Sequence, residues 1–229
     1  MTKKLLRQHN AITEARYEMT ALEKDIVYLL ISKIQETDEF GKEYLIHANE
    51  LIKTLGNKTA DALNKATIRL ISRLYTIQEE NGDLLQVSLM TVAKFCNKTK
   101  ELRVKISKNI LPYLISLKRN YTEFELNMAL SLKGKYSKRL YEILSQYKDI
   151  GSFRISVKEL KERFKLIDKN KEKYEGWTAF EEAILIKPQK EICSKTDLTF
   201  TYEALKTGNK FTDIDFKITI KAKQLRLNF

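Results

Sequence analysis

The sequence predicts an α+β fold in which one order of elements, a helix followed by an antiparallel hairpin, occurs twice. The clearest copy spans residues 178–218, where a helical pattern is followed by two alternating segments around a turn that contains Gly208. The earlier copy ends in a hairpin signal at Asn81-Gly82, the strongest short turn signal for paired strands. A helix followed by a hairpin with a basic tip is the DNA-facing half of a winged helix, so we predict two tandem winged helices.

The first domain is expected to span residues 1–120. Its basic residues 1–19 are expected to form an arm. Thr20 and Glu23 have the spacing of a capping box, and an apolar stripe then predicts a helix over residues 21–35. The other expected elements are a strand at 44–46, helices capped by Asn49 and Thr59, a hairpin made by 76–80 and 84–93, a strand at 102–106, a helix at 108–117 that contains Pro112, and a linker at 119–125.

The second domain is expected to span residues 121–229. Its expected elements are an amphipathic helix at 136–147, a strand at 153–155, a helix capped by Ser156 and Glu159, a polar loop at 168–176, and the helix and hairpin of 178–218.

The helix that begins near residue 178 is the predicted recognition helix of the second domain. Thr178 and Glu181 have the spacing of a capping box, in which a hydroxyl and a carboxylate satisfy free amides at a helix start. Apolar Phe180 and Ile184 recur at helical spacing. Pro188 lies inside the pattern and predicts a kink or a restart, because proline removes a hydrogen bond and clashes with the preceding turn.

Composition limits the class of protein. The 229 residues carry a net charge of +12, and their hydrophobic content of 43% is enough for a core. That charge favours a polyanionic partner, either nucleic acid or an acidic membrane surface. Two cysteines, Cys96 and Cys193, do not make a disulfide framework, so a cytoplasmic protein is expected. The longest apolar run, residues 26–31, is too short to cross a membrane.

The sequence predicts no catalytic site and no cofactor. Gly134-Lys135 is followed by Tyr136, so the phosphate-binding loop of a nucleotide hydrolase is absent. His9 and His47 are the only histidines, and they are too far apart in sequence to form the paired histidine site of a nicking enzyme or a zinc site of the usual spacing.

Candidate DNA contacts lie on predicted helix faces and in basic loops. On the recognition helix, Lys187, Gln189 and Lys190 are expected to lie opposite the apolar stripe, where glutamine can read adenine and lysine can reach guanine or phosphate. In the first domain, Lys65 and Arg69 lie opposite the apolar stripe of their helix. A lysine-rich face is also the ordinary solvated face of a helix. Phosphate contacts are expected from the loop residues Lys169, Lys171 and Lys173 and from the hairpin residues Lys206, Asn209 and Lys210.

An ordered set of residues across the chain resembles one family. Its members are Asn10, Met19-Thr20 and Glu23; Leu132 and the run Tyr136-Ser137-Lys138-Arg139-Leu140-Tyr141-Glu142-Ile143-Leu144; Tyr174, Trp177 and Phe180; Glu191-Ile192 and Thr196-Asp197-Leu198; and Tyr202, Gly208-Asn209-Lys210 and Ile214-Asp215-Phe216. Over residues 10–218 this set resembles the Rep_3 group of iteron-binding plasmid replication initiators, which have two winged-helix domains.

The resemblance implies a DNA-binding initiator with three kinds of partner. These are double-stranded DNA at repeated origin sites, the host replication initiator and helicase machinery, and a second copy of the chain. It also implies that the protein opens the origin, that dimers repress the initiator's own promoter, and that monomers bind the repeats. The hairpin edge around residues 84–92 is the expected dimer interface, because an unpaired edge strand can pair with another chain.

Two departures from the family pattern concern the second domain. Glu181 and Glu182 stand where members often have basic residues, and Asn209 replaces an arginine that is common in the hairpin turn. Base reading is therefore expected further along the helix or in the loop before it. The alternative to an initiator is a winged-helix transcriptional regulator that never opens an origin. An enzyme is the third and weakest class, because no cluster of titratable residues is evident.

Overall fold

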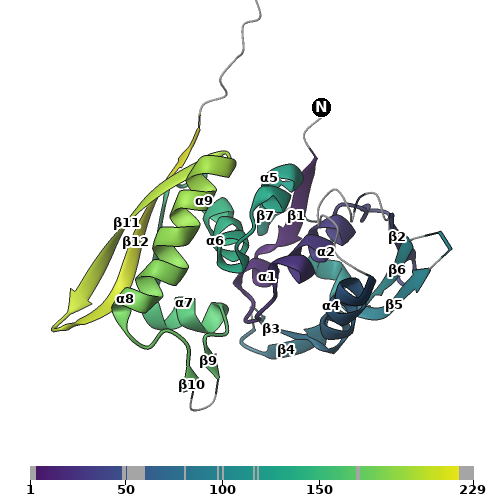
Figure 1. Ribbon diagram of the computed structural model, residues 1–229, viewed down its shortest axis with the longest axis horizontal. Coiled ribbons are helices and arrows are strands. Elements are labelled where there is room, and N and C mark those ends of the chain that lie inside the picture. The colour runs from purple at the N-terminus through teal and green to yellow at the C-terminus, as the bar shows by residue number, and fades with distance from the viewer. Residues whose placement is uncertain are drawn as a thin grey trace, which may run out of the picture.

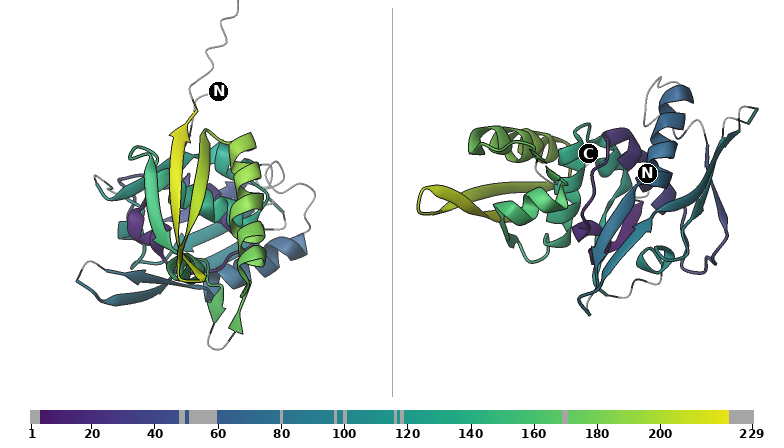
Figure 2. Two further views of the ribbon diagram at one scale, coloured as in Figure 1. Left: turned by 90° about the vertical axis from the view of Figure 1, so that its left-hand side faces the viewer. Right: turned by 90° about the horizontal axis from the view of Figure 1, so that it is seen from below.

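The computed structural model describes residues 4–47, 50, 60–79, 81–96, 98, 99, 101–115, 117, 119–168 and 171–221. Its elements form two units on either side of helix α6, Lys135–Gln146 (Figure 1). Seen from below, a long hairpin projects from one end of the molecule and the first unit lies at the other (Figure 2).

The first unit contains three small sheets packed against helices. Strand order is β2-β6-β5 in one sheet, β3-β4 in the second and β1-β7 in the third. The elements, in chain order, are β1 Leu5–His9, α1 Asn10–Glu14, α2 Ala21–Ile31, β2 Glu43–His47, α4 Ala60–Ser72, β3 Leu74–Gln78, β4 Leu84–Ser88, β5 Met90–Cys96, β6 Glu101–Ile106, the 3-10 turn η1 Leu111–Tyr113, β7 Tyr121–Glu125 and α5 Leu126–Ser131.

Local signals in this unit predicted the start of α2 and the turn of the β3–β4 hairpin, but not all of its elements. The expected strand at 84–93 is two strands, β4 and β5, which belong to different sheets. The capping box of α2 is present, with the Thr20 hydroxyl accepting from the Glu23 amide and the Glu23 carboxylate accepting from the Thr20 amide. The hairpin β3–β4 turns at Gly82, whose φ of +92° suits glycine. The expected helix at 108–117 is wrong, because the described residues of that range contain only the 3-10 turn η1. The predicted caps Asn49 and Thr59 lie outside the described residues.

Strands β1 and β7 correct two expectations. We expected an arm at residues 1–19 and a linker at 119–125, but β1 and β7 pair antiparallel, with Leu6 opposite Phe124. Both side chains are buried in the core. Residues 121–125 are therefore part of a sheet that reaches back to the start of the chain. The division of the chain after residue 120 stays a prediction.

The second unit is a three-stranded sheet with helices on one face, and its strand order is β11-β12-β8. Its long hairpin was predicted and is present, and its turn is Gly208-Asn209. The short pair β9–β10 replaces part of the expected loop at 168–176. The elements are β8 Ser152–Ser156, α7 Val157–Arg163, β9 Ile167–Asp168, β10 Lys171–Glu172, α8 Trp177–Phe180, the π-helical segment η2 Glu181–Ile186, α9 Lys187–Lys195, β11 Leu198–Thr207 and β12 Lys210–Ile220.

The recognition helix of this unit widens in its middle. The predicted capping box at Thr178 is wrong, because Gly176 is the N-cap of α8 and gives no side-chain bond. Segment η2 is π-helical and leads directly into α9, whose second residue is Pro188. A wider turn accommodates the proline ring and its missing amide, so the chain continues as a helix rather than breaking.

Helix α6 is the central element of the fold, and its residues 137–145 are all buried. Its N-cap, Gly134, gives no side-chain bond, and Glu191 from α9 supplies that function instead. The Glu191 carboxylate accepts from the amides of Lys133 at 2.6 Å and Gly134 at 3.0 Å. Partial burial alone raises the pKa of Glu191. Hydrogen bonds outweigh this effect and lower the pKa to about 2; they come from Lys195, Ser137 and these two amides. Glu191 therefore fixes the recognition helix to α6.

Candidate DNA interface

The exposed face of the recognition helix differs from the predicted one. Lys187 and Lys190 are exposed as expected, but Gln189 is half-buried and its side-chain amide donates to the Phe200 carbonyl at 2.8 Å. A π-helical turn holds about one residue more than an α-helical turn, which rotates all later positions by about 100°. The prediction that Gln189 faces outward is therefore wrong, and its amide is used in packing α9 against β11.

The two acidic residues at the start of this helix have partners within the unit. The Tyr202 hydroxyl donates to Glu181 at 3.0 Å, and Glu182 lies 3.7 Å from Lys187. The pKa of Tyr202 is raised to about 12, mainly by burial and also by the hydrogen bond to Glu181. The carboxylate of Glu181 is therefore directed at β11, which reduces its repulsion of a DNA strand at the outer face.

The tip of the β11–β12 hairpin is basic and braced by aromatic rings. Lys206, Asn209 and Lys210 are all exposed there. Phe211 stacks on Trp177 with ring centroids 4.0 Å apart, and the Lys206 ammonium lies 4.5 Å from the centre of the Phe211 ring. Trp177 thus packs against the hairpin. The stack holds the hairpin against the start of the recognition helix.

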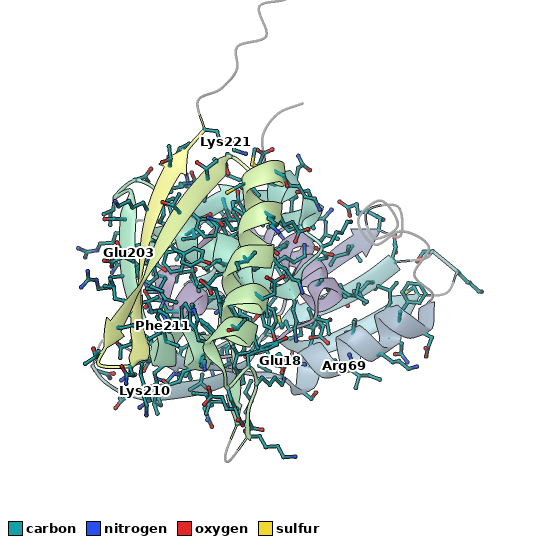
Figure 3. All side chains as sticks on the ribbon, turned by 60° about the vertical axis from the view of Figure 1, so that its left-hand side comes forward. Glu18, Arg69, Glu203, Lys210, Phe211 and Lys221 are labelled. Carbon is teal, nitrogen blue, oxygen red and sulfur yellow. The ribbon has the colours of Figure 1, made fainter. Side chains whose placement is uncertain are left out.

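The loop before this helix carries two further candidate lysines. Lys171 is exposed, whereas Lys173 is bound to Glu18 of the first unit at 2.9 Å. Lys169 lies outside the described residues. In Figure 3, Lys210, Glu18 and Arg69 are spread along one edge of the molecule.

Helix α4 of the first unit presents the remaining candidates. Lys65 and Arg69 are both exposed. Lys65 pairs with Asp61 at 2.7 Å, and Arg69 lies 3.7 Å from the buried carboxylate of Glu23. Exposed Ile68 lies between them on the same face. The first pair is weak, because an exposed ion pair is worth about 0–1 kcal/mol, so Lys65 is available to a phosphate.

Sequence reasoning missed a buried ionic cluster that joins α6 to the first unit. Lys24 from α2 lies 2.5 Å from Glu142 of α6, and the same carboxylate binds Arg139 at 2.9 Å. Tyr17 lies beside both, donating to Glu142 and accepting from Arg139. A second pair joins Lys138 to Asp25 at 2.5 Å. The sequence signal was present in the run at 136–144, but charged residues on a helix are normally assigned to the solvated face.

The electrostatics of this cluster follow from its burial. Desolvation lowers the pKa of Lys24 to about 8, against the opposing effect of Glu142. Burial alone raises the pKa of Glu142, but Lys24 and Arg139 together bring it below its ordinary value. Glu142 is therefore ionised at neutral pH, and its single negative charge is shared by two cations that have left water.

Within the described residues, no group of three or more histidine, cysteine or acidic side chains is placed to hold a metal ion. No helix among these residues has both the length and the apolar character needed to cross a membrane.

The two units, each with a recognition helix and a hairpin wing, define a tandem winged-helix protein. Two family models match in the same order: "Initiator Replication protein, WH1" over residues 5–145 and "Initiator Rep protein, WH2" over residues 156–218. The chain belongs to this family of replication initiator proteins, which confirms both the predicted fold class and the resemblance to the Rep_3 group.

Individual relatives agree with this assignment. A probable replication protein of Bifidobacterium longum is 29% identical over 161 residues, which cover 68% of this chain and 53% of the relative. The match thus spans about half the length of that relative. The PI protein of Escherichia coli is 23% identical over 95% of this chain and 83% of its own length. A crystal structure of a Pi initiator protein in complex with iteron DNA matches with a TM-score of 0.79 and 22% identity, over 96% of this chain and 99% of that one.

Proposed function

We propose that the chain initiates replication of a plasmid by binding repeated sites in double-stranded DNA at the origin. One winged helix would occupy each of two successive major grooves. The observation that carries the proposal is the match of both units together to an initiator solved with iteron DNA. Contacts on both sides of α6 support it further. The buried cluster joins α6 to α2 of the first unit, and Glu191 joins α6 to the recognition helix of the second.

The distribution of charge supports the same function. The chain has a net charge of +12, and its exposed cations include Lys171, Lys190, Lys206 and Lys210. For these four side chains the structure shows no ion pair to a described residue. Cations of this kind bind phosphates without reading sequence. We propose that Lys187 and Lys190 contact bases and that the wing residues and Lys171 contact phosphates.

In the proposed function, the protein assembles a complex on DNA and catalyses no reaction. Bound protein would help to open an adjacent AT-rich stretch and recruit the host replication initiator and helicase machinery. No catalytic step or cofactor is assigned, because the sequence lacks the phosphate-binding loop and the paired histidines that those chemistries require. We place this activity in the cytoplasm, where a plasmid is replicated.

The direct test uses DNA from beside the gene. We expect directly repeated sites of about two helical turns there. A duplex with one repeat should bind at least a thousandfold more tightly than a scrambled duplex of equal length, because specific binding exceeds non-specific binding by about 10³–10⁷. Permanganate probing of an origin plasmid separates an initiator from a transcriptional regulator. Repeat binding without strand opening in the presence of host replication proteins would favour the regulator.

We also propose that the first unit carries the dimer interface of a repressing form. Strand β4 pairs on one side with β3, and its Leu84 side chain is 64% exposed. The neighbouring Val87, by contrast, is buried. An apolar residue on an open strand edge is a site for pairing with a second copy.

Leu84→Asp should therefore shift the protein to the monomer and leave repeat binding intact, as measured by sedimentation velocity and a binding assay on one repeat. Leu45→Asp is the matched control, since Leu45 is an exposed apolar residue on the edge strand β2 of the other sheet. A Leu84 variant that remains dimeric would place the interface elsewhere.

A further inference from the structure

One carboxylate of the first unit binds a cation at the start of α6 and a cation of the second unit. Glu18 belongs to the segment between α1 and α2, and its side chain accepts from the Lys135 ammonium at 2.8 Å. It also accepts from the Lys173 ammonium at 2.9 and 3.0 Å. Lys135 is the first residue of α6, and Lys173 follows strand β10. Glu18 therefore holds two cations that come from different elements.

This site is accessible to a ligand from solution. The Glu18 side chain is 31% exposed and that of Lys173 is 52% exposed. Partial burial alone raises the pKa of Glu18, but the bonds from Lys135 and Lys173 lower it overall, so the group is ionised at neutral pH. A carboxylate that accepts from two ammonium groups makes the same charge-assisted bonds that a phosphate oxygen makes.

The position of Glu18 relates it to the predicted DNA contacts. In Figure 3, Glu18 lies between Lys210 on the wing of the second unit and Arg69 on α4 of the first. Lys173 is itself one of the predicted phosphate contacts. A DNA strand that touched both units along this edge would pass the pair of lysines that Glu18 holds.

We propose that the Glu18 carboxylate competes with DNA phosphates for Lys135 and Lys173. In the free protein, Glu18 occupies both lysines. The inference rests on the proposed DNA binding. A phosphate that takes these lysines must displace a carboxylate already bound to them, so the protein gains less from the contact. Glu18 thereby lowers affinity for DNA of any sequence and leaves a larger share of binding to the base-reading residues.

Glu18→Gln tests the proposal, with a labelled duplex of mixed sequence and about 30 base pairs, or three helical turns. Because phosphate contacts are independent of sequence, this probe is sufficient. The variant should bind more tightly than the wild type at 50 mM salt. Two freed lysines steepen the log–log salt slope by about 0.9 each, so the advantage should fall about tenfold between 50 and 200 mM salt.

Glu175→Gln is the matched control for the loss of one negative charge. Glu175 is exposed in the same segment as Lys173, and the structure shows no ion pair between it and another described residue. This control should leave the salt slope at the wild-type value. A Glu175 variant with the same steepening as the Glu18 variant would attribute the effect to net charge and overturn the proposal.

The lysines supply a second test. The Lys135→Met/Lys173→Met pair should remove the advantage of Glu18→Gln when the substitutions are combined. The proposal is overturned if Glu18→Gln still tightens binding when both lysines are replaced. It is also overturned if a folded Glu18→Gln variant binds no more tightly than the wild type. If Glu18→Gln does not fold, Glu18→Asp, which withdraws the carboxylate by one methylene, should show the same change in smaller measure. Wild-type protein that fails to bind the duplex at 50 mM salt would instead refute the proposed DNA binding.

Discussion

Glu142→Gln should lower the free energy of unfolding by about 3–5 kcal/mol, the usual cost of leaving a buried charge without its partner. The substitution keeps the shape of the side chain and removes the only charge of Glu142. Lys24, 1% exposed, and Arg139, 4% exposed, would then face a neutral amide that itself carries donors. Urea unfolding followed by far-UV circular dichroism measures the loss.

The pH dependence of this loss has a defined sign. Because the folded-state pKa of Glu142 is lowered, its contribution is complete above the ordinary carboxyl pKa. That contribution is lost as the pH falls through the lowered value. The difference between variant and wild type should therefore shrink in acid.

An exposed ion pair provides the control for this experiment. Glu123→Gln removes a carboxylate 2.5 Å from Arg7, whose side chain is 50% exposed. It should cost at most about 1 kcal/mol. If the two variants lose equal stability, the interior cluster is not what holds α6 against the first unit.

The sequence predicted those parts of the fold whose signals are local. The capping box at Thr20, the turns at Gly82 and Gly208 and the helix α6 all depend on residues within a few positions of one another. The pairing of β1 with β7 depends on residues 116 positions apart, such as Arg7 and Glu123. A short segment carries no information about a partner at that distance, so it was assigned to an arm and a linker.

The candidate DNA site was predicted in outline but not in the orientation of its side chains. Exposure of Lys187, Lys190 and the wing residues followed from helix periodicity and turn chemistry. The inward turn of Gln189 did not, because a constant 3.6-residue period cannot represent a π-helical segment. Burial of Lys24 and Glu142 also could not be predicted, since each is tolerated in the core only because the other is there.

DNA binding should weaken about a thousandfold between 50 and 200 mM salt if six phosphates are neutralised. The described candidates that can supply these contacts are Lys65, Arg69, Lys171, Lys187, Lys190, Lys206 and Lys210, all exposed. Fluorescence anisotropy with a repeat-bearing duplex across this range of salt gives the log–log slope. A slope near zero would contradict binding through these cations.

Within this set, substitutions in the wing and in the recognition helix should weaken DNA binding in different ways. Lys206→Ala/Lys210→Ala removes two phosphate contacts, so affinity should fall alike for repeat-bearing and scrambled duplexes, and the slope should lose about 0.9 per contact. Lys190→Ala should instead reduce discrimination, by about 1–3 kcal/mol if the lysine reads a base. If only the wing pair changed sequence preference, the roles of helix and hairpin would be reversed. The stack of Trp177 on Phe211 would then position the hairpin to read bases rather than to contact phosphates.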